Sequence, residues 1–386
     1  MNTRFPADCH IIPLTPQGRG AVATLRVEGT DAVSLVQKFF QSTSCQMLEQ
    51  IPLDRIVYGS WQCRDGLGNE DVVVCRRGTY KVEIHSHGGL TSQTMIIESL
   101  QDQGGQIRDW RDWTPAQYAN DTKAAARIAL ASARTERTAR ILLDQLNGAL
   151  ERELAEIVNL IHAGATNQVL NRLDLLETHA CVGRSLTRPW HVAVAGPPNA
   201  GKSSLINAIL GFERAIVSNQ PGTTRDLLTA ETAFDGWPVQ LLDTAGIHEN
   251  TNLLELASIQ LAMKQMETAD LLLLVFDASQ PWQPQFDSWC VKYPRAIIVH
   301  NKIDLCGSVP ALERYDNIQH TTSAIQGDGV GLLLRLVVQQ LVPVIPPQGA
   351  AVPLLENQIT TIAQAKQWVL SRQNDLAITA LSDLTR

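Results

Sequence analysis

The sequence predicts an α/β domain with a mostly parallel sheet and helices on both of its faces, inserted in a helical domain and preceded by a small α+β domain. Two observations favour this fold class. Over residues 186–342, apolar runs of strand length alternate with helical patterns, which is typical of a parallel sheet. Residues 119–185 are rich in Ala, Leu, Glu and Arg, with few helix breakers. A chain of 386 residues is long enough for more than one core.

The N-terminal domain, residues 1–118, combines two periodicities. Apolar alternation predicts strands at residues 10–14, 21–27, 72–75 and 79–86. Apolar residues three and four apart predict helices at residues 31–40 and 91–103. Together these elements indicate a small α+β domain.

The helical domain is expected in two parts. In the first, residues 119–185, apolar side chains recur every fourth residue, as at Leu142, Leu146 and Leu150. The second part, residues 343–386, begins with a linker that contains Pro343 and Pro353. After this linker, residues 354–384 are expected to form a single C-terminal helix that completes the helical domain.

The α/β domain, residues 186–342, should contain strands that each lead into a loop. They are expected at residues 190–195, 239–242, 271–276, 296–300 and 318–321. Because the carboxyl ends of parallel strands meet at one edge of a sheet, the loops that follow them should form a common site.

Composition excludes several classes of protein. No apolar segment approaches the roughly 20 residues that span a bilayer, so we expect a cytoplasmic protein with no membrane partner. The net charge of −7 disfavours a phosphate-backbone binder, which excludes DNA as a partner and limits any RNA contact to local regions. The 7 cysteines contain no C-x-x-C pair, so free thiols are expected.

A phosphate-binding loop is the first chemical motif. The segment Gly196-Pro-Pro-Asn-Ala-Gly201-Lys202-Ser203 fits G-x-x-x-x-G-K-[ST] and stands between a predicted strand and a predicted helix. Backbone N–H groups of Asn199, Ala200, Gly201 and Ser204 are expected to surround phosphates, with Lys202 on the β and γ oxygens and Ser203 on magnesium.

Three further motifs follow in order along the later strands. Asp243 and Gly246 begin and end a D-x-x-G segment, where the carboxylate can hold a magnesium-bound water and the glycine N–H can contact the γ-phosphate. Asn301-Lys302-Ile303-Asp304 ends with a carboxylate that can accept both N1 and N2 hydrogens of guanine, a pattern that adenine lacks.

The last motif, Thr322-Ser323-Ala324, follows the final predicted strand, and Ser323 and Ala324 would offer backbone N–H groups to guanine O6. Four motifs in this order predict that the chain binds and hydrolyses GTP, with GTP or GDP and magnesium as its ligands. A phosphate-binding loop GTPase domain is therefore the expected form of the α/β fold.

With Pro221-Gly-Thr-Thr-Arg-Asp226 between the first two motifs, the set resembles the tRNA-modification GTPases of the MnmE (TrmE) type. Residues 16–26 resemble that family's folate-binding domain, and Val82-Glu-Ile-His-Ser-His-Gly-Gly89 resembles its E-I-H-x-H-G-G segment. The resemblance covers nearly the whole chain.

The resemblance implies a folate-binding-like N-terminal domain that dimerises and takes a 5-formyltetrahydrofolate-type donor. It also implies an FAD-dependent MnmG partner and tRNA whose wobble uridine is modified. Arg19 and Arg26 are candidate folate contacts, although solvated loop arginines would have the same sequence signature. His85 and His87 lack a third ligand, so we predict structural roles for them rather than metal binding.

Hydrolysis needs a group that orients water, because Ile247 stands where Ras-like enzymes have glutamine. In the family pattern this group is a glutamate twelve residues after the Asp of D-x-x-G, which is Glu255 here. The resemblance also implies that Asn199 coordinates potassium. Switch residues Thr223 and Thr224 would bind the nucleotide, with Thr224 on magnesium.

Two segments depart from the family pattern. Residues 114–123 keep few residues of the G-E-F-T-x-R-A-F-x-N-G-K-type stretch, and the sequence ends in Leu381-Ser-Asp-Leu-Thr-Arg386 where family members have a C-I-G-K tail. We therefore expect intact GTP hydrolysis with reduced or absent modification activity. The alternative is a nucleotide-controlled switch or scaffold, for example in ribosome assembly.

Overall fold

The computed structural model describes residues 9–16, 20–62, 69–118, 120–212, 229–243, 264–306 and 315–385. The chain divides into two compact units, Met1–Ala119 and Asn120–Arg386. Within the described ranges, no helix is both long enough and apolar enough to cross a membrane. The four segments expected from the sequence, and the boundaries between them, stay predictions.

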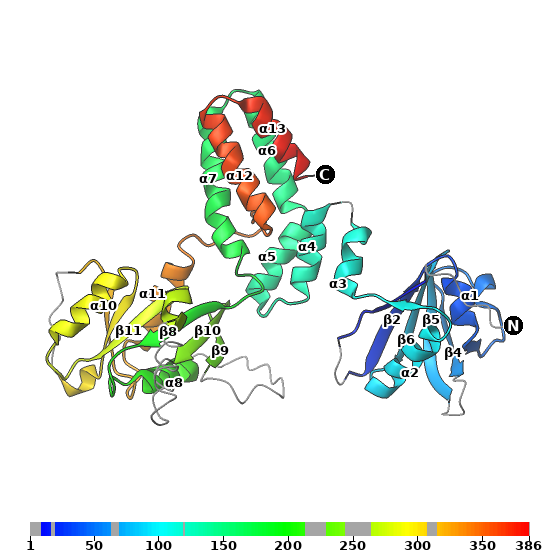
Figure 1. The fold of residues 1–386 in the computed structure, drawn as a ribbon, viewed down its shortest axis with the longest axis horizontal. Coiled ribbons are helices and arrows are strands. Elements are labelled where there is room, and N and C mark those ends of the chain that lie inside the picture. The colour runs from blue at the N-terminus through cyan, green and yellow to red at the C-terminus, as the bar shows by residue number, and fades with distance from the viewer. Residues whose placement is uncertain are drawn as a thin grey trace. The chain divides into compact units, whose positions relative to one another are not determined.

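The described residues of the first unit form a seven-stranded sheet with the strand order β3-β4-β5-β6-β2-β1-β7 (Figure 1). Neighbouring strands are antiparallel except β1 and β7, which are parallel. The strands are β1 (His10–Pro13), β2 (Val22–Glu28), β3 (Phe40–Ser42), β4 (Ile56–Gln62), β5 (Asn69–Gly78), β6 (Lys81–His87) and β7 (Gln106–Ile107).

The helical elements of the first unit are short, apart from α2. They are α1 (Ala32–Gln37), η1 (Leu48–Gln50), α2 (Leu90–Gln101), α3 (Trp110–Trp113) and η2 (Thr114–Gln117). The core lies on one face of the sheet, where Leu25, Ile84 and Trp61 pack against Ile96 and Leu100 of α2. Side chains at alternate positions of β2 and β6 point to the other face, which carries polar and charged groups.

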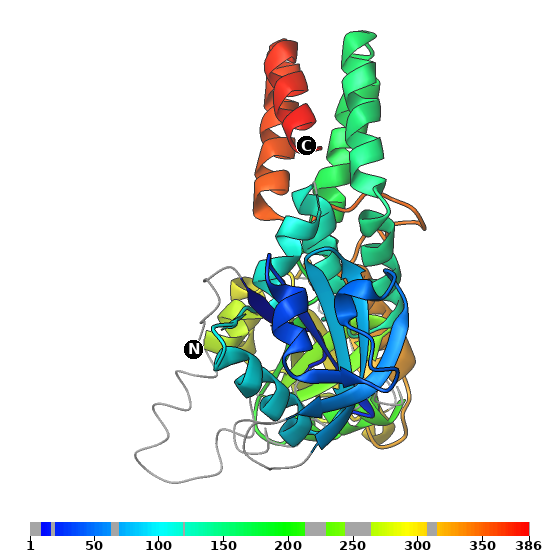
Figure 2. The ribbon, with the colours of Figure 1, turned by 90° about the vertical axis from the view of Figure 1, so that its right-hand side faces the viewer.

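Helices form the first part of the second unit and return at its end. They are α4 (Asp121–Leu130), α5 (Glu136–Leu146), α6 (Ala149–His162), α7 (Thr166–Gly183), α12 (Glu356–Leu370) and α13 (Asn374–Asp383). In Figures 1 and 2, α6 and α7 run beside α12 and α13, and apolar side chains from all four form one core. Gln358 of α12 also donates to Thr122 Oγ1 of α4 at 2.7 Å.

The prediction of a single C-terminal helix is wrong. The chain forms α12 and α13 with a break between them, where Arg372 has a left-handed backbone with φ 60°. This turn lets α13 fold back against α12 and pack against α6 through Leu381. A straight helix over residues 354–384 would have left that apolar face without a partner.

The linker before α12 is held by buried polar groups. Gln145 of α5 donates to Ala350 O at 2.9 Å and accepts from Val352 N at 3.0 Å. His179 of α7 bonds the carbonyl of Ala351 at 2.9 Å. Three backbone groups of this linker are therefore satisfied by side chains of α5 and α7.

A six-stranded sheet with the order β13-β12-β11-β8-β10-β9 forms the described centre of the second unit. All neighbours are parallel except β9 and β10, which form an antiparallel hairpin. The strands are β8 (Trp190–Ala195), β9 (Thr229–Phe234), β10 (Trp237–Asp243), β11 (Leu271–Asp277), β12 (Ile297–Asn301) and β13 (Gln319–Thr322).

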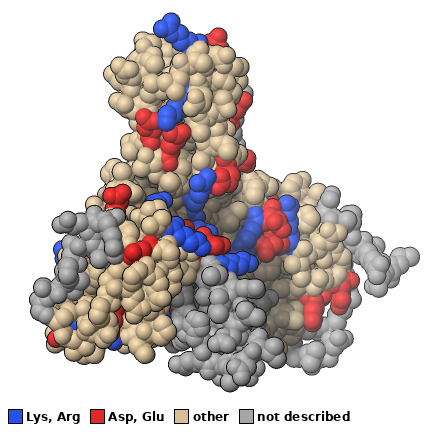
Figure 3. Space-filling model, turned by 60° about the vertical axis from the view of Figure 1, so that its left-hand side comes forward, with Lys and Arg blue, Asp and Glu red and all other residues tan. Residues whose placement is uncertain are grey.

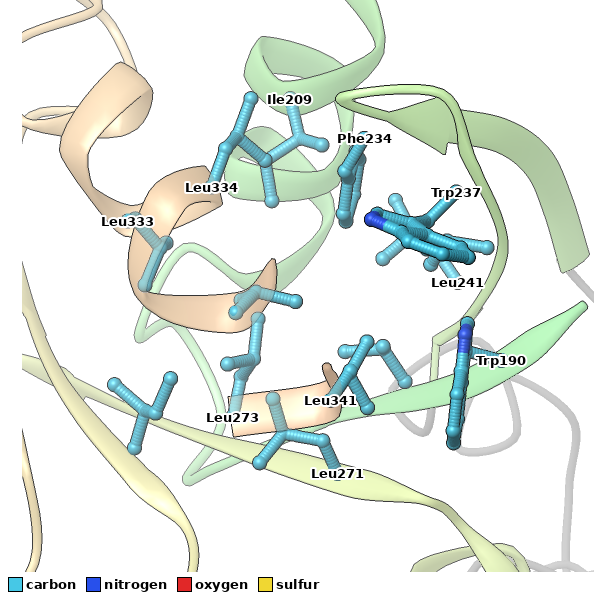
Figure 4. Close-up of a cluster of buried hydrophobic side chains, with 14 of the residues drawn as sticks. Trp190, Ile209, Phe234, Trp237, Leu241, Leu271, Leu273, Leu333, Leu334 and Leu341 are labelled. Carbon is cyan, nitrogen blue, oxygen red and sulfur yellow. The ribbon is translucent and has the colours of Figure 1, made fainter. Parts of the chain in front are cut away.

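Both faces of this sheet are covered, as the sequence predicts. The helical elements are α8 (Lys202–Phe212), η3 (Pro284–Phe286), α10 (Asp287–Lys292), η4 (Ile303–Leu305) and α11 (Val330–Leu341). Figure 4 shows Ile209 of α8 and Leu333 and Leu334 of α11 packed over Leu273 and Phe234 of the sheet. Phe286 and Cys290 pack on the opposite face. Packing on both faces holds the sheet in place, and the carboxyl ends of its parallel strands lie along one edge.

Candidate nucleotide-binding site

The loop between β8 and α8 has a backbone that only glycine tolerates at two positions. Gly196 has φ 156°, and a Cβ there would lie 2.0 Å from the carbonyl oxygen of Val275. Gly201 has φ 90°, and a Cβ there would lie 2.3 Å from Nδ2 of Asn301. The loop therefore packs directly against β11 and the loop after β12, and it leads into the N-terminus of α8.

Lys202 begins α8 and turns its side chain back over the loop. Its Nζ donates to the carbonyls of Gly196 at 2.9 Å and Pro197 at 2.8 Å. The side chain is buried, and burial lowers the pKa of the ammonium, partly offset by the negative charge of Asp243. A buried cation that donates its hydrogen bonds in the described structure to neutral carbonyls, with one carboxylate nearby, is suited to bind an anionic ligand.

Ser203 and Asp243 bring two oxygens together beside this lysine. Ser203 Oγ donates to Asp243 Oδ2 at 2.7 Å, and Asp243 ends β10, whose residues pair with β8. Ser204 follows in the first turn of α8 and is exposed. A hydroxyl and a carboxylate are the hard oxygen donors that magnesium prefers.

Asn301 joins three loops through its side-chain amide. Its Nδ2 donates to Ala200 O at 3.0 Å, and its Oδ1 accepts from Thr322 Oγ1 at 3.2 Å and from Ala324 N at 3.1 Å. The residue is buried at the end of β12. It therefore fixes the phosphate-binding loop, the segment after β12 and the segment after β13 relative to one another.

Asp304 is exposed and is held from one side only in the described structure. Its Oδ1 accepts from Ser323 Oγ at 2.6 Å. Lys302, two residues earlier, has φ 65° and donates from Nζ to Asp277 Oδ2 at 2.8 Å. The carboxylate of Asp304 therefore faces solvent, next to the side chain of Lys302, which is held in place by its contact with Asp277.

The structure brings together most of the residues predicted for the site. They are Asn199, Ala200, Gly201, Lys202, Ser203, Ser204, Asp243, Asn301, Lys302, Asp304, Ser323 and Ala324. Asn199 is exposed on the loop with φ 62°. Thr223, Thr224, Gly246, Glu255 and Arg19 lie outside the described residues, as does Ile247.

Two contributing residues were missed. Asp277, at the end of β11, pairs with Lys302, and Thr322, at the end of β13, donates to Asn301. Both are polar residues at the carboxyl end of a strand. The same position at the end of a strand identified Asp243 in the sequence, so this signal could have identified them too. Asp277 lies outside the four motifs, and Thr322 was expected to contribute only as part of a backbone N–H segment, so the contact of its hydroxyl with Asn301 was missed.

The remaining candidate, Arg26, belongs to the first unit. Its guanidinium pairs with Glu83 and lies 5.0 Å from the ring centroid of Trp113. His85 contacts Thr24 Oγ1 at 3.0 Å and His87 contacts Glu70 at 2.7 Å. In the described part of the chain, no group of three or more His, Cys, Asp or Glu side chains could hold a metal ion.

Comparison with known proteins identifies the family. A family model described as "50S ribosome-binding GTPase" matches residues 191–302. The "tRNA modification GTPase MnmE" of Acinetobacter baumannii (strain AYE) is 31% identical over 359 residues, which cover 82% of this chain and 78% of that protein. The chain belongs to the MnmE family.

MnmE from Thermus thermophilus is 30% identical over 409 residues, and the aligned region covers 96% of this chain and 91% of that protein. Among solved structures, the G domain of the Thermotoga maritima FeoB iron transporter is 26% identical with a TM-score of 0.32, over 40% of this chain and 99% of its own. As a member of the MnmE family with a GTPase domain, the chain is a GTP-hydrolysing enzyme.

Proposed function

We propose that the loops at the carboxyl edge of the second sheet form the GTP site of a tRNA-modification enzyme. The observation that carries the proposal is Asn301, whose amide connects the phosphate-binding loop to the two loops assigned to guanine. In this role Lys202 contacts the β and γ oxygens of the nucleotide. Backbone N–H groups of residues 199–204 surround the phosphates.

Guanine selection falls to Asp304 and to the segment that contains Ser323 and Ala324. The exposed carboxylate of Asp304 can accept two hydrogen bonds from a guanine edge, and its contact with Ser323 Oγ limits its rotation. An adenine edge offers no such pair of donors. The site therefore prefers GTP and GDP over adenine nucleotides.

Magnesium fits the donor set of this site. Ser203 would hold it directly and Asp243 would hold it through a magnesium-bound water, and Thr224, which lies outside the described residues, would be a further direct ligand. When bound, the ion supplies positive charge that stabilises the developing negative charge on the phosphate oxygens. The oxygens of Ser203 and Asp243 already lie within hydrogen-bond distance of each other.

Water for hydrolysis is oriented by Glu255 in this proposal. Ile247 cannot hydrogen-bond a water, and Glu255 stands at the family's spacing after Asp243. A carboxylate can accept a proton of the attacking water and direct its lone pair toward the γ-phosphate. Thr223 and Gly246 complete the nucleotide contacts. All of these positions except Asp243 lie outside the described residues.

Potassium is the second cation that the family resemblance implies. Asn199 is exposed on the phosphate-binding loop, and its amide oxygen is a donor suited to such an ion. The proposal includes a homodimer in which two GTPase domains meet. It also includes the FAD-dependent MnmG protein and tRNA as partners of the modification reaction.

Charge limits how tRNA can be contacted. The net charge is −7, and on the face shown in Figure 3 the coloured basic residues lie in small groups next to acidic ones. Summed electrostatic attraction is therefore weak, and tRNA would be bound through a few positions or together with MnmG.

Arg26 does not fit the role of a folate contact. Its guanidinium is already paired with the buried carboxylate of Glu83 and covered by Trp113. Arg19 lies outside the described residues. A 5-formyltetrahydrofolate site in the first unit stays a prediction from the family resemblance, and no step of the proposed function depends on it.

The test is the rate of GTP hydrolysis in potassium and in sodium. We expect a higher rate in potassium for the unaltered protein and a cation-independent rate for Asn199→Ala. Asn207→Ala, at an exposed asparagine of α8, is the matched control and should keep the potassium response. An unaltered protein that is indifferent to the cation would refute the role of Asn199. Mass analysis of wobble nucleosides from cells lacking the gene tests the tRNA role.

A further inference from the structure

Asp277 is an acidic residue at the edge of the site that the four motifs do not include. It ends β11 directly opposite Asn301 of β12, and Ala278 N donates to Asn301 O at 2.8 Å. One carboxylate oxygen accepts from Lys302 Nζ at 2.8 Å. The other accepts from the backbone N and the hydroxyl of Ser279 at 2.9 and 2.6 Å. Both oxygens are thus fixed in orientation.

Lys302 is the residue that this carboxylate restrains. Its backbone has the left-handed φ of 65°, which a residue with a side chain adopts at a cost. Its Cε lies 3.8 Å from the point that a Cβ on Gly201 would occupy, so the stem passes beside the phosphate-binding loop. A free lysine side chain samples many rotamers, and the ion pair with Asp277 selects one of them.

The stem lies between the two ends of the proposed site. Asn301 precedes Lys302 and holds the phosphate-binding loop, whereas Asp304 follows it and faces solvent. An aliphatic stem fixed at this point offers an apolar wall to a nucleotide that extends from one end to the other. The ion pair also neutralises the ammonium, whose side chain is 27% exposed.

We propose that Asp277 is a positioning residue that strengthens guanine-nucleotide binding by holding Lys302 in place. This inference rests on the proposed guanine site. Asp277 touches no nucleotide in this account, so its substitution should affect affinity through Lys302 alone. GTP and GDP should be affected equally, because the wall contacts the part of the ligand that they share.

A double-mutant cycle tests the proposal by titrating a fluorescent GDP and a fluorescent GTP analogue into four proteins. We expect Asp277→Asn to weaken both by roughly 10-fold, the order expected for loss of a hydrogen bond to a charged group. Lys302→Met keeps an aliphatic stem and loses the ion pair, and should weaken binding similarly. The double variant should bind no more weakly than either single variant, because both substitutions remove the same ion pair.

Asp270→Asn is the matched control, because Asp270 precedes the opposite end of β11 and pairs with Arg188 at 3.3 Å. It should leave both affinities unchanged. Losses that add in the double variant would overturn the proposal, as would an Asp277→Asn protein with unaltered affinity. If Asp277→Asn does not fold, Ser279→Ala is the substitute, because it removes one hydrogen bond to the same carboxylate. It should weaken the affinity for both nucleotides by a smaller factor. Unchanged affinity in Ser279→Ala would then overturn the proposal.

The guanine assignment is checked separately in the same titration. Asp304→Asn should shift preference toward xanthine nucleotides. An unshifted preference would mean that the proposed base site is wrong. A shifted preference together with unaltered binding by Asp277→Asn would leave the base site intact and reject this inference alone.

Discussion

Among the described residues, buried charged side chains lie in both units, and the partners of Lys202 in the second unit and Glu83 in the first differ in kind. At the nucleotide site of the second unit, Lys202 is buried and bonds neutral backbone carbonyls. On the polar sheet face of the first unit, Glu83 is buried and accepts from both Arg26 and Arg77. A buried charge with neutral partners can still bind an anion, whereas a buried charge between opposite charges is already neutralised.

Position on the sheet explains this difference. Lys202 and Asp243 lie at the carboxyl edge of a parallel sheet, where loops leave room for a ligand. Glu83 lies in the middle of β6, opposite Arg26 of β2. There the neighbouring strands supply its partners directly. The edge of the second sheet is therefore suited to chemistry, and the face of the first sheet to stability.

The largest effect is expected at Glu255, the residue proposed to orient the attacking water. Glu255→Ala should slow GTP hydrolysis by roughly 10² to 10⁴-fold, the range typical of a positioned acid or base, and leave GTP affinity nearly unchanged. Single-turnover hydrolysis together with a binding titration measures both. Glu267→Ala, at an exposed glutamate, is the control. A parallel fall in affinity and rate would assign Glu255 a structural role.

Lys202 tests whether the buried cation acts on the ligand. Lys202→Ala should weaken GTP binding by about 100-fold or more, because several charge-assisted hydrogen bonds to phosphate are lost at once. The same change at the exposed Lys292 should have no effect on binding. Affinity within a few-fold of the unaltered protein would show that another cation binds the phosphates.

Glu83 tests the other half of the comparison. Hydrogen bonds and charges from Arg26 and Arg77 lower the pKa of this carboxyl, although burial by itself would raise it. Glu83→Gln should destabilise the first unit by about 3 kcal/mol, because two arginines lose their buried partner. Hydrogen exchange of amides in β2 and β6 measures this, and GTP binding should be unaltered.

The pH dependence of that stability follows from the sign of the pKa shift. A carboxyl with a lowered pKa stabilises the folded state above its unfolded pKa, and this contribution is lost as pH falls through the lowered value. Glu83→Gln should remove this part of the acid sensitivity. Arg134 and Glu231 form an exposed ion pair, so Glu231→Gln should change the stability and its pH dependence little.

The placement of the nucleotide motifs at the ends of strands could be predicted from the sequence, because the residues of each motif are linked by short spacing and strand context. Lys202 and Ser203 follow a buried strand, and Asp304 follows another, so each motif is assigned to the end of a strand from its neighbours along the chain. Asp277 was missed since its partner Lys302 is 25 residues away and only the register of β11 and β12 brings the two together.

Long-range packing accounts for the other differences. The pairing of Arg26 with Glu83 joins residues 57 apart, so Arg26 seemed available as a folate contact. The break at Arg372 was missed although residues 371–375, Ser-Arg-Gln-Asn-Asp, are all polar, and the reversal there is favoured by burial of Leu381 against α6. The strands β3, β4 and β7 of the first unit were also missed, as was β9, the antiparallel edge of a sheet whose other strands are parallel.

The preference of Asp304→Asn for guanine or xanthine nucleotides tests the central claim most directly, because this claim assigns ligand recognition to the carboxyl edge of the second sheet. In competition titrations, the unaltered protein should prefer GDP over xanthosine diphosphate, and Asp304→Asn should reverse that preference, since its amide can donate to the xanthine 2-oxo group. An Asp304→Asn protein that still prefers GDP to the same degree would contradict the account.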